Sequence, residues 1–252
     1  MADQATPAHR ARLGRALGPE PKAVSGAVLL LPGGEEVSGR RPSPLLATAS
    51  VRALGRRLAR AGREDGLATH VVHYRLRGWN GSEANLAQDA AWAVDEVVRR
   101  YGDVPVCLVG LGMGGRAGLR AGGHEAVNSV VALAPWLPAE DVAAPPEPVK
   151  QLAGRQVLIV HGTHDGRTDP ELSFRLAARA KKANRDVCRF EVHADGHGLT
   201  QYRDEVLALA EDFVMGAVFG RPVSRPVRDA LAAPPPLGLR MPLAAGFSPS
   251  SR

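Results

Sequence analysis

Cysteine is nearly absent from this sequence, and its scarcity excludes two classes of small stabilised protein. Only Cys107 and Cys188 occur among the 252 residues. Two cysteines this far apart supply neither a disulfide framework nor the paired spacing of a zinc ribbon or finger. Each lies inside an apolar run of strand length, where a thiol behaves as a small buried hydrophobic group. We therefore expect a domain that a large hydrophobic core stabilises.

Long apolar runs are also missing. No stretch approaches the roughly 18 apolar residues that a membrane-spanning helix requires. The first residues, MADQATPAHRARLGRALG, include basic side chains but no apolar segment after them of the kind found in a signal peptide. The sequence therefore predicts a cytoplasmic protein without a membrane partner.

Aromatic residues are scarce at 4%, and the excess positive charge is confined to the two ends of the chain. Residues 1–23 carry a net charge of +2 and residues 216–252 a net charge of +4, so residues 24–215 are neutral. Nucleic-acid-binding proteins usually gather basic side chains on one face and add aromatic ones that stack on bases. We therefore expect no nucleic-acid partner.

Apolar runs of strand length alternate with amphipathic stretches of helix length. Runs rich in Val, Ile and Leu predict strands at 27–31, 68–75, 104–110, 127–134, 156–162 and 187–193. Amphipathic stretches predict helices at 49–62, 83–102, 115–122, 169–183 and 202–218. Strands this continuously apolar have both faces covered, as in a parallel sheet between helices. The predicted fold class is α/β, with a doubly wound, mostly parallel sheet of about six core strands.

The two ends of the chain are rich in Pro, Ala, Arg and Ser and lack sustained apolar periodicity. Such segments bury too little apolar surface to offset the entropy that is lost on ordering. We therefore predict a flexible N-terminal tail at 1–23, one domain at 24–218 and a flexible C-terminal tail at 219–252. The connection between the strands at 127–134 and 156–162 is short and broken by prolines, which predicts that no cap domain is inserted there.

The unusual residues lie in loops that follow the strands, where the ligands of such sheets bind. The run VCLVGLGMGG passes from an apolar strand through glycines into a helix, with Gly112 at its centre. A GxGxxG pattern of the phosphate-binding kind can be traced through Gly110, Gly112 and Gly115. It follows a middle strand instead of the first, and no acidic residue stands at a strand end about 20 positions later. These differences disfavour dinucleotide binding.

With this frame the sequence resembles the α/β-hydrolase family over about residues 24–215, and in particular its small lidless members of the dienelactone-hydrolase type. The family's nucleophile elbow is GxSxG between a strand and a helix. Gly110, Gly112 and Gly114 keep that frame, but glycine stands where the family has serine. The preceding residue is Leu111, where the family often has His.

Two later loops continue the resemblance in the family's order of nucleophile, acid and base. HGTHD resembles the acid loop and implies that Asp165 is the carboxylate, and DGHG resembles the base loop and implies that His197 is the imidazole. In a working enzyme of this kind the carboxylate orients the imidazole, which takes the proton of the serine. Gly112 has no hydroxyl group, so serine-type acyl transfer through it is excluded.

The resemblance also implies an oxyanion hole and a ligand pocket. The run LLLPGGEE resembles the family's oxyanion loop, which makes the N–H groups of Gly34 and Met113 the candidate donors. Trp79 and Trp136 are candidate apolar walls of the pocket, with packing in the core as the alternative for each. Arg77 is a candidate contact for an anionic group of the substrate.

A metal site is an alternative interpretation of the acid and base loops. These loops hold six side chains that first-row metals accept, namely His161, His164, Asp165, His193, Asp195 and His197. Because His161 and His193 lie nearer the strand ends and fit the family pattern or core packing, we expect neither a metal nor another cofactor.

Three interpretations of function remain. In the first, the chain is a pseudoenzyme of esterase ancestry, impaired or inactive at Gly112, with a pocket that binds a small molecule or an ester-like substrate. In the second, His197 oriented by Asp165 activates a water molecule for noncovalent hydrolysis. In the third, the chain is a deliberately inactivated esterase. The difference at Leu111 disfavours the third, because inactivation requires a change at the nucleophile alone.

Overall fold

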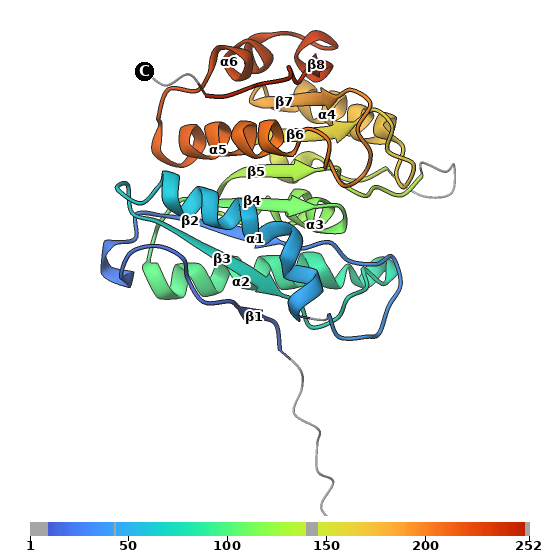
Figure 1. Ribbon diagram of the computed structural model, residues 1–252. Coiled ribbons are helices and arrows are strands. Elements are labelled where there is room, and N and C mark those ends of the chain that lie inside the picture. The colour runs from blue at the N-terminus through green and yellow to red at the C-terminus, as the bar shows by residue number, and fades with distance from the viewer. Residues whose placement is uncertain (1–9, 43, 140–145, 250–252) are drawn as a thin grey trace, which may run out of the picture.

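The computed structural model describes residues 10–42, 44–139 and 146–249. Its centre is an eight-stranded sheet in the order β1-β3-β2-β4-β5-β6-β7-β8 (Figure 1). Six longer strands pair in parallel, and they coincide with the six predicted strands: β2 Gly26–Leu31, β3 Leu67–His73, β4 Val106–Leu111, β5 Val127–Leu133, β6 Gln156–Gly162 and β7 Val187–Val192. The predicted α/β fold class is confirmed.

Helices cover both faces of the sheet, as the continuous apolar strands predict (Figure 1). Alternate residues of β2 face two separate cores, with Leu29 in one and Leu30 in the other. The helices are α1 Pro44–Ala61, α2 Asn85–Tyr101, α3 Met113–Ala121, α4 Pro170–Ala183, α5 Arg203–Phe219 and α6 Arg225–Ala232. Buried side chains of α2, α3 and α4 belong to the first core, and those of α1, α5 and α6 to the second.

The helices have two further properties that bear on function. Of those in the part of the chain that the structure describes, none has the length and apolar character of a membrane span. Between β5 and β6, the described residues 134–139 and 146–155 form only one short helical turn, η3 Lys150–Leu152, so no cap helix occurs among them.

The N-terminal segment packs on one edge of the sheet. Residues 1–9 of the predicted flexible tail lie outside the described residues, but β1 Arg12–Leu13 pairs antiparallel with β3. The N–H of Gly14 donates to the carbonyl of Val71 at 2.8 Å, which continues this pairing beyond β1. The prediction of a flexible tail is therefore wrong for the residues just after position 9, because their backbone groups complete the sheet edge.

The C-terminal segment differs more clearly from the predicted flexible tail at 219–252. In its described part, α6 is followed by a turn, η4 Leu237–Leu239, and by β8 Met241–Pro242, which pairs with β7. Val227 and Leu239 are fully buried. Apolar side chains are few and widely spaced in this Pro-rich segment, so its composition does not predict a packed structure. The buried ones nevertheless belong to the two cores of the domain. The described part of this segment is therefore a helix, a turn and an edge strand instead of the predicted flexible tail.

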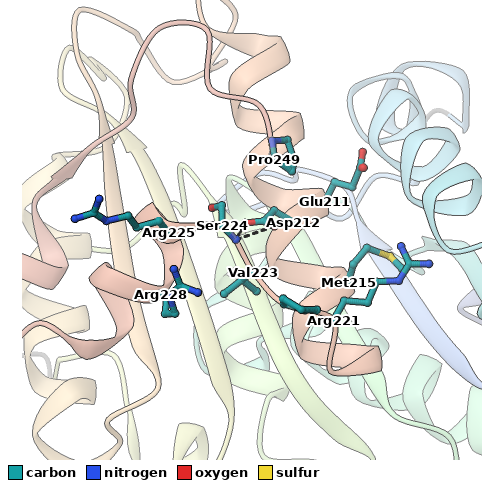
Figure 2. Close-up of a pocket in the computed structure, with 10 residues that line it drawn as sticks. Glu211, Asp212, Met215, Arg221, Val223, Ser224, Arg225, Arg228 and Pro249 are labelled. Atoms are coloured by element: carbon teal, nitrogen blue, oxygen red, sulfur yellow. Dashed lines mark hydrogen bonds between the residues drawn. The ribbon is translucent and has the colours of Figure 1, made fainter. Parts of the chain in front are cut away.

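A cleft of about 700 Å³ separates α5 from the chain that leads into α6. Figure 2 shows Asp212 of α5 pointing at Ser224, whereas the side chains of Glu211 and Met215 project from the other side of the helix. The Asp212 carboxylate accepts a hydrogen bond from the Ser224 N–H at 2.9 Å and so fixes the start of α6. The C-terminal half of α5 lies toward the amino ends of the strands, since the carbonyl of Ala217 accepts from Asn128 at the start of β5. The cleft therefore lies away from the edge where the predicted site residues gather.

Candidate active site

The turn between β4 and α3 has the backbone geometry of a sharp elbow. Gly112 has φ +56° and ψ −119°, a conformation that residues with a Cβ rarely adopt and that glycine takes without that penalty. Its N–H donates to the carbonyl of Leu133 at 2.9 Å. Its own carbonyl accepts from the N–H groups of Arg116 and Trp136 at 3.2 and 3.0 Å. These three bonds fix the turn to β5 and to the first turn of α3.

The glycines on either side of Gly112 are required by close backbone contacts. A Cβ on Gly110 would lie 2.1 Å from the carbonyl oxygen of Gly114, and a Cβ on Gly114 would lie 2.1 Å from the carbonyl oxygen of Leu31. No side chain fits at such distances, because the neighbours are backbone atoms that cannot move aside. The steric reason for the glycine frame in the sequence is therefore present in the structure.

Three loops bring Gly112, Asp165 and His197 together. Nδ1 of His197 lies 2.8 Å from Oδ2 of Asp165, and an ideal Cβ built on Gly112 lies 3.2 Å from Nε2 of His197. The imidazole thus stands between the carboxylate and the elbow. With Nδ1 donating to Asp165, Nε2 is left as an acceptor that faces the elbow.

Asp165 is held in its ionised form. Its side chain is fully buried, which favours the neutral acid, but His161, His197 and the backbone N–H groups of Arg167 and Thr168 all donate to its oxygens. These bonds prevail over burial and hold the pKa of the Asp165 carboxyl well below its usual range. Asp165 therefore remains a carboxylate that can orient His197 and stabilise its charged form.

His161 has a role that the sequence did not assign to it. It is fully buried at the end of β6, with Nε2 3.0 Å from Oδ2 of Asp165 and Nδ1 2.9 Å from Oγ of Ser173. Burial lowers the pKa of His161, so the ring is neutral and Nε2 donates to the carboxylate. The pattern HGTHD is the only sequence signal, since it places His161 four residues before Asp165.

The two candidate oxyanion donors lie side by side. An ideal Cβ on Gly34 would stand 3.6 Å from Cβ of Met113, and 2.7 Å from the carbonyl oxygen of Arg77. Met113 is the first residue of α3, so its N–H has no acceptor within the helix. Among the described residues, neither N–H donates to another protein group. Both can therefore donate to an oxyanion at the elbow.

The candidate pocket residues differ in what they contact. Trp79 is only 3% exposed and lies under the Arg116 guanidinium at 3.9 Å, which favours packing over contact with a ligand. Arg77 is half exposed and pairs with Glu35 at 3.2 Å. Trp136 is partly buried beside the elbow. Its backbone N–H donates to the carbonyl of Gly112. Of the three candidates, Trp136 alone bonds to Gly112, and it does so through its backbone.

A small cavity of about 50 Å³ adjoins the elbow on the side of α1 and α5. Leu111 and Leu133 line it at the ends of β4 and β5, and Leu199 and Val206 line it from the segment after His197. These four side chains are apolar, and Arg203 of α5 is the one charged residue that lines the cavity among the described residues. The space suits a short alkyl or acyl group beside Gly112.

The acid and base loops do not gather a metal-binding set. Within the described ranges, no group of three or more His, Cys, Asp and Glu side chains is arranged to hold a metal ion. Of the six metal-binding candidates, Asp195 instead accepts from the backbone N–H groups of Gly196, Thr200, Gln201 and Tyr202 and shapes the His197 loop.

Comparison by sequence gives no relatives: no protein-family model matches the chain, and no curated protein does either. Comparison by structure gives many. The chain is similar to an esterase of Pyrococcus furiosus, with a TM-score of 0.58 and 14% identity over 77% of this chain and 82% of that one. It is similar to Est1E of Butyrivibrio proteoclasticus, solved with bound ferulic acid, with a TM-score of 0.57 and 16% identity over 83% and 95% of the two chains.

A monoacylglycerol lipase of Paleococcus ferrophilus is a third similar structure, with a TM-score of 0.58 and 17% identity over 82% of this chain and 99% of that one. Identities this low establish the fold alone. The sheet order and helix layers described above agree with it. The chain therefore has the α/β-hydrolase fold.

Proposed function

We propose that this protein with the α/β-hydrolase fold derives from an esterase or acyl hydrolase, is impaired or inactive as a serine hydrolase at Gly112, and retains a pocket for a small ester-like molecule. One observation carries the proposal. Nε2 of His197 faces the elbow, with the ideal Cβ position of Gly112 3.2 Å away, and glycine supplies no hydroxyl there. In this proposal His197 is the base and Asp165 its carboxylate, and the sequence lacks the hydroxyl group that they would activate.

The magnitude of the effect follows from serine hydrolases in general. Removing the nucleophile of a serine triad lowers turnover by about a millionfold and leaves roughly a thousandfold over water from the oxyanion hole and binding. Cys107 and Cys188 are fully buried in β4 and β7, and burial raises the pKa of each thiol to about 12. Neither thiol can therefore replace a serine at the elbow.

The proposed ligand is a small ester or the acid derived from one. The Butyrivibrio protein of the same fold was solved with ferulic acid, and the Paleococcus protein is a monoacylglycerol lipase. In this chain the oxyanion donors Gly34 and Met113 would bind a carbonyl or carboxylate oxygen. The apolar cavity beside Leu111 would take a short alkyl or acyl group. An ester or carboxylate fits both features.

A second candidate function uses the same two residues without a nucleophile. His197 presents Nε2 to the elbow while Asp165 holds Nδ1 at 2.8 Å, which is the arrangement of a general base for water. This function predicts slow ester hydrolysis by the unchanged chain that is lost in His197→Ala. A hydrolysis rate that His197→Ala leaves unchanged would exclude it.

The proposed function is tested by restoring the hydroxyl group. Gly112→Ser is expected to hydrolyse p-nitrophenyl acetate at least about a hundredfold faster than the unchanged chain. Gly112→Ala is the matched control, because it adds the same Cβ without the oxygen, and Gly112→Ser with His197→Ala removes the base. Leu111→His combined with Gly112→Ser tests the second departure from the family. Ester hydrolysis at ordinary enzyme rates by the unchanged chain would refute the proposal.

A further inference from the structure

A separate cavity of about 230 Å³ lies at the sheet edge where β1 meets β3 and α1 crosses them. Arg15 from the segment after β1, Arg52 and Arg56 from α1, and His73 from β3 surround it. Leu17, Leu30 and Val71 line it with apolar side chains, here called its floor; Leu30 is buried, and Leu17 is 42% exposed. No acidic residue lines the cavity among the residues that the structure describes.

Two regular elements, α1 and β3, each supply a pair of the residues that line the cavity. Arg52 and Arg56 are four residues apart on α1, so they lie on the same face of the helix. Val71 and His73 are two residues apart on β3 and face the same side of the sheet. Gly55 lets the helix approach closely, since a Cβ there would stand 2.4 Å from Cδ1 of Leu30. The cavity is thus bounded by regular elements.

The three arginines are exposed and have no carboxylate partner among the described residues, a property that they share with Arg60 and Arg228 but not with several of their neighbours. Arg57, next to Arg56 on α1, pairs with Glu211 at 2.5 Å. In the cleft of Figure 2, Arg221 pairs with Asp65 and Arg225 pairs with Asp229. In contrast, Arg15, Arg52 and Arg56 form no ion pair with any described residue.

Like charges at this spacing repel one another, so their grouping lowers stability unless an anion joins them. The positive field is also felt by the neighbouring histidine. Burial, together with the charges of Arg12 and Arg52, lowers the pKa of His73. At neutral pH His73 is therefore an uncharged hydrogen-bonding group at the rim, and the arginines carry the charge.

We propose that this cavity binds a small organic phosphate monoester. Guanidinium groups hold phosphate oxygens through paired, charge-assisted hydrogen bonds, and three guanidinium groups match the several oxygens of one phosphate. The apolar floor contacts the carbon part of the ligand. The volume of about 230 Å³ is below the roughly 300 Å³ at which drug-sized pockets begin, which limits the ligand to a small molecule.

The test is titration of the full-length protein with phenyl phosphate, followed by calorimetry at low salt. Saturable one-site binding is expected, and Arg52→Gln and Arg56→Gln should each weaken it on the order of tenfold. Arg60→Gln is the matched control, because Arg60 lies on the same helix but outside the cavity, and its affinity should stay within about twofold of the unchanged protein's. Inorganic phosphate should bind more weakly than phenyl phosphate, since it does not contact the floor.

Several results would overturn the proposal. These are the absence of saturable binding, equal losses in Arg60→Gln, and equal affinity for phthalate, a dicarboxylate of similar size. Binding of a short DNA duplex with equal losses in all three variants would identify an extended polyanion surface instead. If a variant does not fold, the NMR signals of the His73 imidazole in the unchanged protein provide the test instead. They should shift on addition of phenyl phosphate until the site is saturated. Signals that do not shift would count against the site.

Discussion

His161 and His197 donate hydrogen bonds to the same carboxylate oxygen, Oδ2 of Asp165, at 3.0 and 2.8 Å. One ring is fully buried and the other has a partly exposed side chain. The buried ring of His161 therefore holds the Asp165 carboxylate in position, and the carboxylate in turn orients the ring of His197 that faces the elbow. His161 acts on the site through Asp165, as a positioning residue.

Removing the His161 donor should lower stability measurably. His161→Leu leaves a buried carboxylate short of one hydrogen bond, so the free energy of unfolding should fall by about 1–3 kcal/mol. His161→Gln keeps an N–H near the position of Nε2 and should lose less. Urea unfolding at pH 7.5 measures both variants. Equal losses would show that the ring matters for its volume and not for its hydrogen bond.

Stability should also fall as the pH is lowered. Burial lowers the pKa of His161 below its ordinary value of 6.5, so the unfolded chain takes up the proton first. The stabilisation is complete above about pH 6.5 and is lost as the pH falls below it, by at most about 1.4 kcal/mol per pH unit. Asp165, whose pKa lies below its ordinary 3.8, adds a further loss below about pH 4. His70 is also buried with a lowered pKa and contributes in the same direction as His161.

Urea unfolding at several pH values from 7.5 to 5 measures this dependence. In His161→Gln the decline over that range should be shallower, because one of the titrating groups is gone. An identical slope in the variant would assign the decline to other groups.

A side chain at the elbow should be tolerated at a moderate cost in stability. Both Gly112→Ser and Gly112→Ala place a Cβ on a residue with φ +56°, which costs about 1–3 kcal/mol. The two variants should therefore lose similar amounts in thermal or urea unfolding. A much larger loss for serine alone would mean that its hydroxyl lacks a partner at His197.

The glycines flanking Gly112 should tolerate no side chain. Gly114→Ala would place its Cβ 2.1 Å from the Leu31 carbonyl oxygen, so a loss of more than about 4 kcal/mol or failure to fold is expected. Gly39→Ala is the control, since no atom lies within 4 Å of its Cβ position. Soluble yield and the unfolding midpoint distinguish them. Equal behaviour of the two variants would contradict the close approach of α3 to β2.

The docked C-terminal segment can be tested through one buried contact. Val227→Ala in α6 should lower the free energy of unfolding by about 1–3 kcal/mol, because Val227 is fully buried. Val37→Ala is the control, since Val37 is 76% exposed. Unfolding in urea measures both. If Val227→Ala were as harmless as the control, the segment would not be docked in solution.

Much of the fold follows from local pattern. The six parallel strands and the five helices between and after them are continuous apolar or amphipathic runs, and both kinds of run persist long enough to be recognised. The short edge strands and α6 cannot be recognised in this way, because β1 and β8 have only two residues each and α6 buries only Val227 and Ala230. Their order comes from contacts with distant strands, which composition does not reveal.

The candidate site likewise has residues that short sequence motifs identify and others that only contacts between distant elements reveal. Gly112, Asp165 and His197 stand in short motifs, and the structure brings them together, although their roles stay predictions. The buried ring of His161 and the packing of Trp79 under Arg116 depend on distant elements. The net charges of the segments likewise do not reveal a local excess of positive charge, since Arg52 and Arg56 of the neutral part meet Arg15 of the N-terminal part only in the folded chain.

The two-residue strands β1 and β8 also give the molecule its outer borders. A parallel sheet of long apolar strands offers unpaired N–H and C=O groups along each side, and such sides readily recruit strands from other molecules. Here both sides are occupied by short pieces from the two ends of the same chain, and each piece is too brief to serve as a template itself. The segments predicted to be flexible tails thus leave fewer unpaired backbone groups on β3 and β7 for a strand of another molecule to pair with.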